Sequence, residues 1–187
     1  MKLEPGHTAI ITGASRGIGP HIVEAMAKRG LHLVLAARDY NALEQVAQTH
    51  RQPGQRIIAM PVDLTRREGP LELMKRARAT VGSVDVLVNN AGLFSPGYFE
   101  DTTDDELDQM VALNVTSLMR LTRLAMPDML RRNTGHIVNM GSLAGLGAAA
   151  FVETYSATKH AVVGFSRSLR ASLQQRKSKV SVSVVCP

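Results

Sequence analysis

Two polar side chains in the last third of the sequence have the types and spacing of an acid–base pair. Tyr155 and Lys159 are four residues apart in a stretch with helical spacing, so both project from one face of the expected helix. A free phenol has a pKa of about 10, but a nearby ammonium favours its ionised form. Such a pair can give a proton to a substrate oxygen or take one from a hydroxyl. Taken alone, a Tyr–Lys pair is more often only a contact on a helix surface.

A glycine-rich segment near the N-terminus could hold a phosphate group. Residues 12–19 read Thr-Gly-Ala-Ser-Arg-Gly-Ile-Gly and lie between a short apolar run and a helical stretch. Glycines let the backbone approach a pyrophosphate, and the following helix supplies free N–H groups and a positive dipole end. The spacing G-x-x-x-G-x-G differs from the common G-x-G-x-x-G of dinucleotide sites. Taken alone, the segment could equally be a plain strand-to-helix turn.

Two motifs of acyl-transfer enzymes offer a competing interpretation. Residues 13–17 match G-x-S-x-G, which would make Ser15 a nucleophile, and residues 156–159 match S-x-x-K. The first motif follows the first apolar run instead of several strands, and no HGGG segment precedes it. The S-D-N and K-T-G segments that accompany S-x-x-K are absent. Hydrolase chemistry is therefore a minor alternative.

Short apolar runs alternate with helical stretches along the chain, and these elements must position the polar residues. The runs are mostly apolar on both faces, as in strands of a buried parallel sheet. Asp39 is a candidate N-cap, and residues 103–106 match a capping box. The alternation predicts one α/β domain over residues 1–187, with a doubly wound parallel sheet and helices on both faces. The expected strands are 8–11, 33–36, 57–60, 84–88, 136–139 and 180–185, and the expected helices are 18–29, 40–50, 67–81, 103–132 and 153–176.

Apolar residues recur at helical spacing in the two long helices, and we expect them to face the core. They are Leu107, Val111, Leu118, Leu121 and Ala125 in the first helix, and Ala161, Phe165, Leu169 and Leu173 in the second.

In combination, the motifs resemble the classical short-chain dehydrogenase/reductase family. The glycine loop is followed, in the family's order, by Asn-Asn-Ala-Gly at 89–92, by Ser142, and by the Y-x-x-x-K motif of Tyr155 and Lys159. Asn114 matches the family's helix asparagine. The match covers essentially the whole chain. Bacterial 3-oxoacyl-carrier-protein reductases look similar, but so do oxidoreductases with unrelated substrates, so the resemblance indicates the family and not the substrate.

The resemblance implies a Rossmann-type fold with strand order 3-2-1-4-5-6 and an oxidoreductase that transfers hydride between a nicotinamide and a carbonyl or secondary alcohol. Tyr155 would be the general acid or base, and Ser142 would polarise the substrate oxygen. Lys159 would also hold the nicotinamide ribose, and Asn114 would anchor a water that joins Lys159 to solvent. The residues expected to bind the cofactor are Gly13, Ser15, Arg16, Gly17, Ile18, Gly19, Arg38, Asp63, Leu64, Asn90, Ala91, Gly92, Tyr155 and Lys159.

The end of the second expected strand favours NADP(H) over NAD(H). NAD sites often place an acidic residue there, where it binds the ribose 2′-hydroxyl. In this chain the position is Ala37, Arg38 follows it, and Arg16 lies in the glycine loop. Two guanidinium groups favour a 2′-phosphate. Asp39 is one position too late, and the N-cap role is sufficient to explain it.

Composition and charge exclude several other classes. The chain has 187 residues with a single Cys, which excludes a disulfide framework within it, and six isolated His, so we expect no metal. The net charge is +6, but the basic residues are scattered and aromatic residues make up only 4%. We therefore expect a phosphate-bearing cofactor and not a nucleic acid. No apolar run approaches the roughly 18 residues of a membrane span, and no apolar stretch precedes Pro5, so we expect a cytoplasmic protein.

The sequence stops at Pro187, where the family continues with a nicotinamide-binding segment, a substrate-covering segment and a last strand. We therefore expect the C-terminal part and the last strand of the family to be absent from this chain. A catalytically weak dinucleotide-binding or interaction protein is the alternative function. The two long helices resemble the pair through which family members assemble, so we expect a homodimer or a homotetramer.

Overall fold

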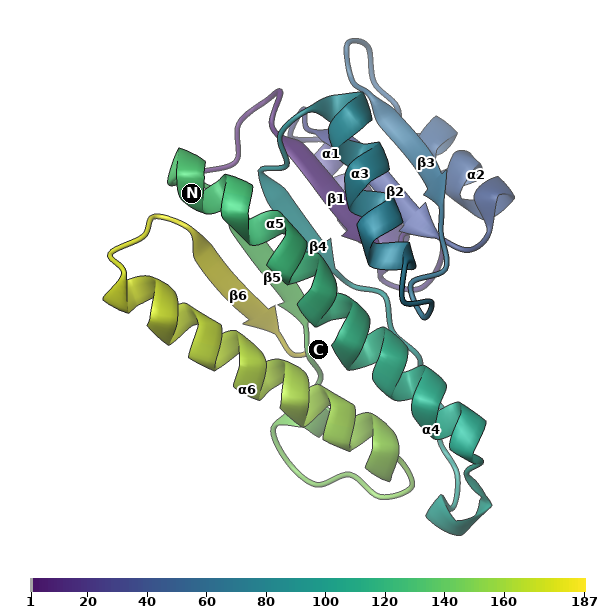
Figure 1. Ribbon diagram of the computed structural model, residues 1–187. Coiled ribbons are helices and arrows are strands. Elements are labelled where there is room, and N and C mark those ends of the chain that lie inside the picture. The colour runs from purple at the N-terminus through teal and green to yellow at the C-terminus, as the bar shows by residue number, and fades with distance from the viewer. Residues whose placement is uncertain (1) are drawn as a thin grey trace.

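A parallel sheet of six strands forms the centre of the computed structural model, which describes residues 2–187 (Figure 1). The strands are β1 (Thr8–Thr12), β2 (His32–Ala37), β3 (Ile57–Pro61), β4 (Val86–Asn89), β5 (His136–Met140) and β6 (Ser181–Val185). Their order is β3-β2-β1-β4-β5-β6, which confirms the order that the resemblance implies. Every neighbouring pair is parallel, so the carboxyl ends of the strands meet at one edge of the sheet.

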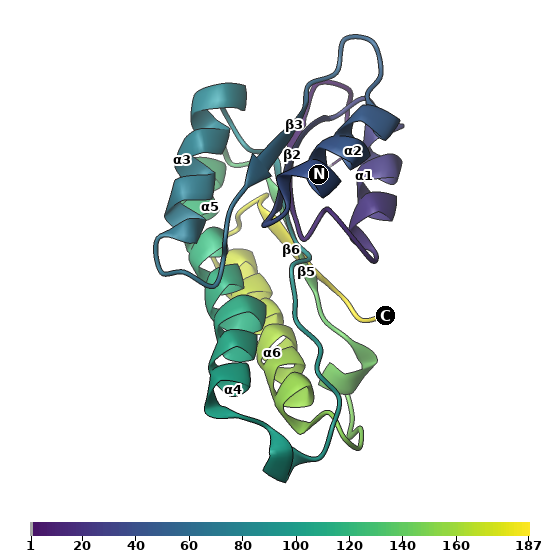
Figure 2. The ribbon, with the colours of Figure 1, turned by 90° about the vertical axis from the view of Figure 1, so that its right-hand side faces the viewer.

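Helices cover both faces of the sheet, as predicted (Figure 2). One face carries α1 (Gly19–Ala27) and α2 (Tyr40–His50), and the other carries α3 (Gly69–Val81), α4 (Asp104–Val111), α5 (Leu118–Arg132) and α6 (Glu153–Gln175). A π-helical stretch, η2 (Ala112–Ser117), joins α4 to α5, and two short 3-10 segments, η1 (Phe99–Asp101) and η3 (Leu143–Gly145), come after β4 and β5. None of the helices within residues 2–187 is both long and apolar enough to cross a membrane.

Two apolar cores lie on the two faces of the sheet because successive strand residues point in opposite directions. In β1, Ala9 and Ile11 belong to the core under α1 and α2, whereas Ile10 belongs to the core under α3, α5 and α6. All three side chains are fully buried. The sheet is therefore covered on both sides at its centre, as the apolar runs predict.

Side-chain caps fix the starts of two helices as predicted. The Asp39 carboxylate accepts a hydrogen bond from the Ala42 N–H at 3.1 Å at the start of α2. At the start of α4, Thr103 and Glu106 form a reciprocal capping box, in which each side chain accepts from the other's main-chain N–H. Both caps depend on local sequence and stabilise their helices by about 1 kcal/mol each.

The predicted apolar stripe of the long helix is wrong at Val111, and Leu107 is only half-buried. Val111 is 45% exposed, whereas Met110 is 2% exposed. The cause is η2, since a π-helical turn contains an extra residue and rotates α4 about the helix axis relative to α5. After this turn the prediction is confirmed, because Leu118, Leu121 and Ala125 are buried.

The buried stripe of α6 also differs from the prediction, which named Ala161, Phe165, Leu169 and Leu173. Only Leu173 is fully buried, and the other three are half-buried. The stripe instead includes Ser166, whose hydroxyl donates to the Val162 main-chain oxygen and accepts from the Asn139 amide at 2.9 Å. A polar residue thus takes a core position, which apolar spacing could not indicate.

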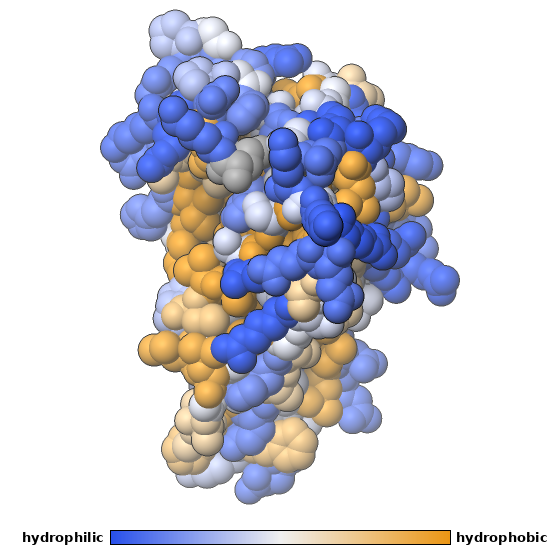
Figure 3. Space-filling view, turned by 90° about the vertical axis from the view of Figure 1, so that its left-hand side faces the viewer, coloured by the Kyte–Doolittle hydropathy of each residue, from blue (hydrophilic) through white to orange (hydrophobic). Residues whose placement is uncertain are grey.

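The predicted two-sided burial fails for β6, which pairs only with β5 among the strands of residues 2–187. Only Val182 of this strand is buried, since Ser181, Ser183 and Val184 are half-buried and Val185 is 45% exposed. Strand β6 lies towards the left of Figure 1, and Figure 3 shows the molecule from that side. Apolar patches are visible on this surface between hydrophilic side chains.

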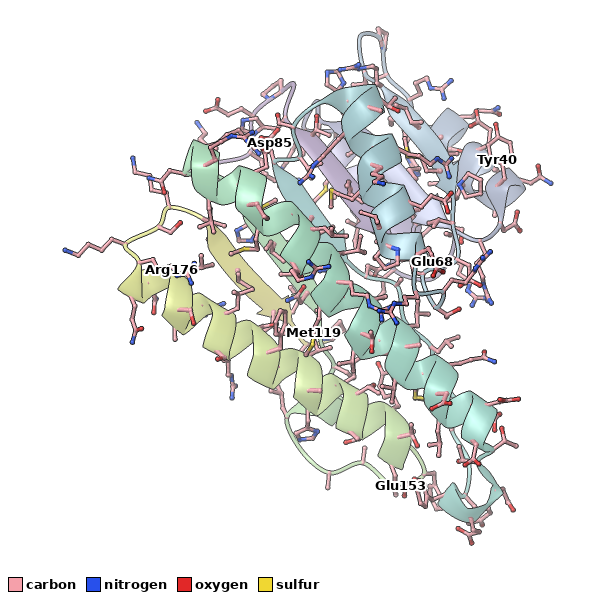
Figure 4. All side chains as sticks on the ribbon, viewed as in Figure 1. Tyr40, Glu68, Asp85, Met119, Glu153 and Arg176 are labelled. Atoms are coloured by element: carbon pink, nitrogen blue, oxygen red, sulfur yellow. The ribbon has the colours of Figure 1, made fainter. Side chains whose placement is uncertain are left out.

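The amino ends of β1 and β4 are joined through Asp85 (Figure 4). One carboxylate oxygen accepts from the Thr8 N–H at 2.9 Å, and the other forms an ion pair with Arg132 at 2.7 Å. Asp85 therefore ties the strands together at the edge of the sheet opposite to their carboxyl ends.

Candidate active site

A cleft of about 650 Å³ lies at the carboxyl ends of the strands. It is centred on β1 and β4, between which the strand order reverses, and ligands of open α/β sheets bind at such a point. Its volume lies within the range of small-molecule sites. Of the predicted site residues, the cleft is lined by Gly13, Ser15, Arg16, Gly17, Ile18, Arg38, Asp63, Leu64, Asn90, Ala91, Gly92, Ser142, Tyr155 and Lys159. Gly19 and Asn114 lie behind this lining.

The glycine loop depends on the absence of side chains at two of its positions. Gly13 has a φ of +64°, and a Cβ there would lie 2.8 Å from the Ala91 Cα. A Cβ at Gly19 would lie 2.1 Å from the Gly13 carbonyl oxygen. Any larger residue at either position would separate the loop from its neighbours, so the tight turn requires glycine.

The same loop presents unpaired hydrogen-bond donors to the cleft. Among residues 2–187, no group accepts from the main-chain N–H of Gly17 or Ile18. Helix α1 starts without a side-chain cap and without an acidic residue in its first turn. Gly17 has a φ of +61°, and no atom lies within 4 Å of the position a Cβ would take. Free N–H groups at a helix N-terminus beside open space fit a phosphate group.

Thr12 and Asn90 connect the glycine loop to the end of β4. The Thr12 hydroxyl donates to the Val88 oxygen at 3.2 Å and accepts from the N–H groups of Asn90 and Ala91 at 3.0 Å. The Asn90 amide donates to the carbonyl oxygens of Thr12 and Gly13, both at 3.0 Å. These bonds fix the two sides of the cleft relative to each other. Thr12 is part of the predicted glycine-rich motif, but its hydroxyl was not predicted to act both as donor and as acceptor.

The end of the cleft beside β2 and β3, called its outer end, is basic and has one fixed carboxylate. Arg38 is exposed there, Ala37 is apolar, and Asp39 is engaged as the N-cap of α2. Arg16 of the glycine loop is also exposed and lines the cleft. The Thr65 hydroxyl and N–H both donate to one oxygen of Asp63, at 2.7 and 2.9 Å. These hydrogen bonds, mainly that of the hydroxyl, hold the pKa of the Asp63 carboxyl below its ordinary value, so this group is ionised at neutral pH.

Tyr155 and Lys159 lie at the opposite end of the cleft, beside the end of β5, which is called its inner end. Lys159 is only 5% exposed, and its Nζ donates to the Met140 main-chain oxygen at 2.8 Å. Burial lowers the pKa of this ammonium to about 8, and among residues 2–187 only the negative charge of Cys186 in its ionised form opposes this shift. The Lys159 Nζ lies 5.5 Å from the centre of the Tyr155 ring, and the Phe94 ring meets the Tyr155 ring edge-on at 4.9 Å. The phenol is therefore held between an apolar ring and a buried ammonium.

Ser142 and Asn114 flank this pair in different ways. Ser142 lines the cleft, and its hydroxyl accepts from the Ala144 N–H at 3.3 Å at the start of η3. Asn114 lies within η2 and is 1% exposed. Its amide pairs with both main-chain groups of Leu93, accepting from the N–H at 2.7 Å and donating to the oxygen at 2.9 Å. Asn114 therefore holds the loop after β4 from behind the residues that line the cleft, next to Gly92.

The donor set fits a dinucleotide with a phosphate-bearing middle and a ring beside Tyr155. Free N–H groups lie midway along the cleft, the Arg38 guanidinium lies at its outer end, and acid–base groups lie at its inner end. Met140 and Phe94 also line the inner end, although sequence reasoning did not name them. Within residues 2–187, no three His, Cys, Asp or Glu side chains gather closely enough to hold a metal ion.

Comparison with known proteins agrees with this geometry. Residues 7–187 match the family model of the short chain dehydrogenases. A ketoacyl reductase, HetN, from Nostoc sp. is 37% identical over 187 residues, which are the whole of this chain and 64% of that protein. The chain therefore spans less than two thirds of that relative's length.

Two solved structures of the same kind are also similar. A short chain dehydrogenase/reductase from Burkholderia phymatum in complex with NAD has a TM-score of 0.94 and 33% identity, covering 100% of this chain and 67% of that one. A metagenomic short-chain oxidoreductase in complex with NADP has a TM-score of 0.90 and 34% identity, covering 98% of this chain and 82% of that one. The match over residues 7–187, together with the fold, shows that the chain belongs to the short-chain dehydrogenase family.

Proposed function

We propose that the protein is an oxidoreductase that transfers hydride between NADP(H) and a carbonyl compound or secondary alcohol. The observation that carries the proposal is the presence of Tyr155 and Lys159 in the same cleft as the glycine loop. The nicotinamide supplies or accepts the hydride when the cofactor is bound. The names of similar proteins, such as the ketoacyl reductase of Nostoc sp., fit a carbonyl substrate.

The chain's own contribution is to move a proton and to hold the substrate oxygen. In the reducing direction the Tyr155 hydroxyl gives its proton to that oxygen, and in the oxidising direction the ionised phenol takes it back. Charged Lys159 stabilises the ionised phenol because its ammonium is buried nearby, where the interaction is screened less than in water. Ser142 lines the cleft beside these groups and donates a hydrogen bond to the substrate oxygen.

The preference for NADP over NAD is part of the proposal. Arg16 and Arg38 line the cleft, and Ala37 offers no carboxylate at its outer end. The Asp39 carboxylate accepts a hydrogen bond from the Ala42 N–H as the N-cap of α2, so it does not replace the missing carboxylate at position 37. A 2′-phosphate would meet two guanidinium groups, whereas a 2′-hydroxyl would lack its usual acidic partner.

The test uses the natural full-length protein with NADPH and a panel of ketones. Tyr155→Phe should abolish turnover and leave the dissociation constant of NADP within about threefold, because the ring still packs but the proton is lost. Tyr40→Phe is the matched control, since Tyr40 is exposed at the start of α2 and outside the cleft lining (Figure 4). If Tyr155→Phe retains a substantial fraction of kcat, Tyr155 is not the acid. If the unmodified protein binds the cofactor without any turnover, it is a binding protein.

We also propose that α4, α5 and α6 carry the assembly surface of a homodimer or homotetramer. These helices lie together on one face (Figures 1 and 2), and Val111 and Met119 are exposed there at 45% and 36%. Exposed apolar side chains on long helices favour association with a second copy. Sedimentation of the full-length protein tests this, and the double substitution Val111→Lys with Met119→Lys should shift the distribution towards monomer. A monomeric unmodified protein would contradict it.

A further inference from the structure

The turn of α6 that carries Tyr155 and Lys159 also carries a buried hydroxyl. Thr158 is 3% exposed and precedes Lys159 directly. Its Oγ1 donates to the Tyr155 main-chain oxygen at 2.7 Å and accepts from the Asn114 Nδ2 at 3.1 Å. A hydroxyl has one donor and can accept as well, so both bonds form together. No other side chain within residues 2–187 shows a hydrogen bond that joins α6 to η2.

These two bonds complete a continuous connection across three elements. The Asn114 amide is clamped on the N–H and the oxygen of Leu93, so its orientation is fixed with Nδ2 towards Thr158. The path runs from the loop after β4, through the Asn114 amide and the Thr158 hydroxyl, to the Tyr155 carbonyl. Gly92 lies beside this path, and a Cβ placed on it would be 3.3 Å from the Asn114 Oδ1 and 3.7 Å from the Lys159 Nζ. The path therefore lies directly behind the acid–base pair.

We propose that Thr158 is a positioning residue, whose hydroxyl holds the Tyr155–Lys159 turn of α6 against the asparagine in η2. The catalytic roles of Tyr155 and Lys159 are taken from the proposed function. The new element is the Thr158 hydroxyl, which fixes the position of both residues.

Removing the hydroxyl alone has a predictable local effect. In Thr158→Val the volume is nearly kept, but one Nδ2 hydrogen of Asn114 loses its partner, and Asn114 is only 1% exposed. A buried donor without a partner is unfavourable, so Asn114 rotates or the turn of α6 moves to admit water. Thr158→Ser keeps the hydroxyl and loses only a methyl group, so it should behave like the unmodified protein.

Thr122 supplies a matched control. It is 1% exposed on α5, and its hydroxyl likewise accepts from an asparagine amide, the Asn89 Nδ2, at 3.2 Å. It does not line the cleft. Thr122→Val therefore removes the same kind of bond and should lower the melting temperature without changing the reaction.

The first experiment measures NADPH-dependent ketone reduction by the full-length protein. A displacement of about 1 Å can reduce a rate roughly a hundredfold. We expect Thr158→Val to lower kcat by about ten- to a hundredfold while KM for NADPH stays within about threefold, because the adenine and phosphate contacts lie elsewhere. Thr158→Ser and Thr122→Val should retain kcat within about twofold. A Thr158→Val protein that loses thermal stability but keeps its kcat, as Thr122→Val does, would reduce Thr158 to a structural residue and overturn the proposal.

The second experiment does not depend on turnover. NMR of lysine ¹³Cε in the cofactor-free protein follows the titration of Lys159, assigned by its loss in Lys159→Met. Burial keeps the pKa of Lys159 near 8, with the Tyr155 ring and Cys186 as its neighbours. Water admitted by a loosened turn should raise the midpoint in Thr158→Val by about half a pH unit or more, and not in Thr158→Ser or Thr122→Val. An unchanged midpoint contradicts the proposal. Absent turnover in the unmodified protein would instead contradict the proposed function.

Discussion

The ammonium of Lys159 is held by the main-chain oxygen of Met140, at 2.8 Å, inside the protein. Met140 ends β5 and Lys159 lies in the first half of α6, so this bond joins the sheet to the helix that carries Tyr155. A single neutral acceptor does not replace the water that a charged ammonium loses on burial. Burying the Lys159 ammonium beside Tyr155 therefore costs free energy of desolvation. Because this cost applies only to the protonated amine, it makes the free energy of unfolding depend on pH.

Lys159→Met should stabilise the protein at neutral pH. The pKa of Lys159 is about 8 in the fold and 10.5 ordinarily, so between these values the unfolded chain holds a proton that the folded protein has released. The free energy of unfolding of the unmodified protein should thus rise from pH 8 to 10.5. The free energy of unfolding of Lys159→Met should exceed that of the unmodified protein by up to about 3 kcal/mol at pH 7. This difference should become smaller between pH 8 and 10.5.

Urea unfolding at a series of pH values measures this difference. Lys75→Met is the control, because Lys75 is exposed on α3 and its removal should give no such pH dependence. An advantage for Lys159→Met that stays constant between pH 7 and 10.5 would show that the ammonium is not destabilised by burial.

Arg38→Ala should weaken NADP binding by about tenfold or more and leave NAD binding within about threefold. The reason is the loss of a charge-assisted hydrogen bond to the 2′-phosphate, worth roughly 1.5–3 kcal/mol. The pair Ala37→Asp with Arg38→Ala should reverse the preference towards NAD. Isothermal titration of both cofactors measures this, with Arg67→Ala as the control because Arg67 is exposed outside the cleft lining. Equal dissociation constants in the unmodified protein would contradict the proposed preference.

Features that depend on local chemistry could be predicted from the sequence. The glycine loop, the Asp39 cap and the Thr103–Glu106 capping box each need only residues a few positions apart. The strand order came from the resemblance, and the parallel arrangement came from the alternation of runs. The gathering of Ser142, Tyr155 and the glycine loop in one cleft could be expected once that order was assumed.

Features set by tertiary contacts could not be predicted in this way. Apolar spacing assigned Val111 to the core because it contains no sign of the π-helical turn after that residue. Apolar spacing also gave no signal for the burial of the polar residues Thr158 and Ser166. Their hydroxyls accept hydrogen bonds from the amides of Asn114 and Asn139, which lie on other elements of the fold. The burial of Lys159 has the same origin, since its partner lies on β5.

Thr65→Val should reduce stability in a pH-dependent manner. Two hydrogen bonds from Thr65 hold the pKa of Asp63 below its ordinary value of 3.8. A carboxyl with a lowered pKa contributes stability above its ordinary value, and this stability is lost as the pH falls through the folded value. The melting temperature of Thr65→Val should therefore lie below that of the unmodified protein at pH 6, and the gap should narrow below pH 3.8. Thr65→Ser keeps the hydroxyl and should show no gap, and a gap that does not change with pH would contradict the argument.

Gly145→Ala should lower kcat through the contact between η3 and α6. A Cβ at Gly145 would lie 2.7 Å from both the main-chain carbon and the oxygen of Lys159, and backbone atoms cannot yield as a flexible side chain can. The loop with Ser142 must therefore move away from the turn with Tyr155, at a cost of about ten- to a hundredfold in kcat. Gly147→Ala is the matched control in the same loop, because no atom lies within 4 Å of its Cβ position. Steady-state kinetics distinguish the two, and equal kcat values for both variants would show that the distance between Ser142 and Tyr155 does not limit the reaction.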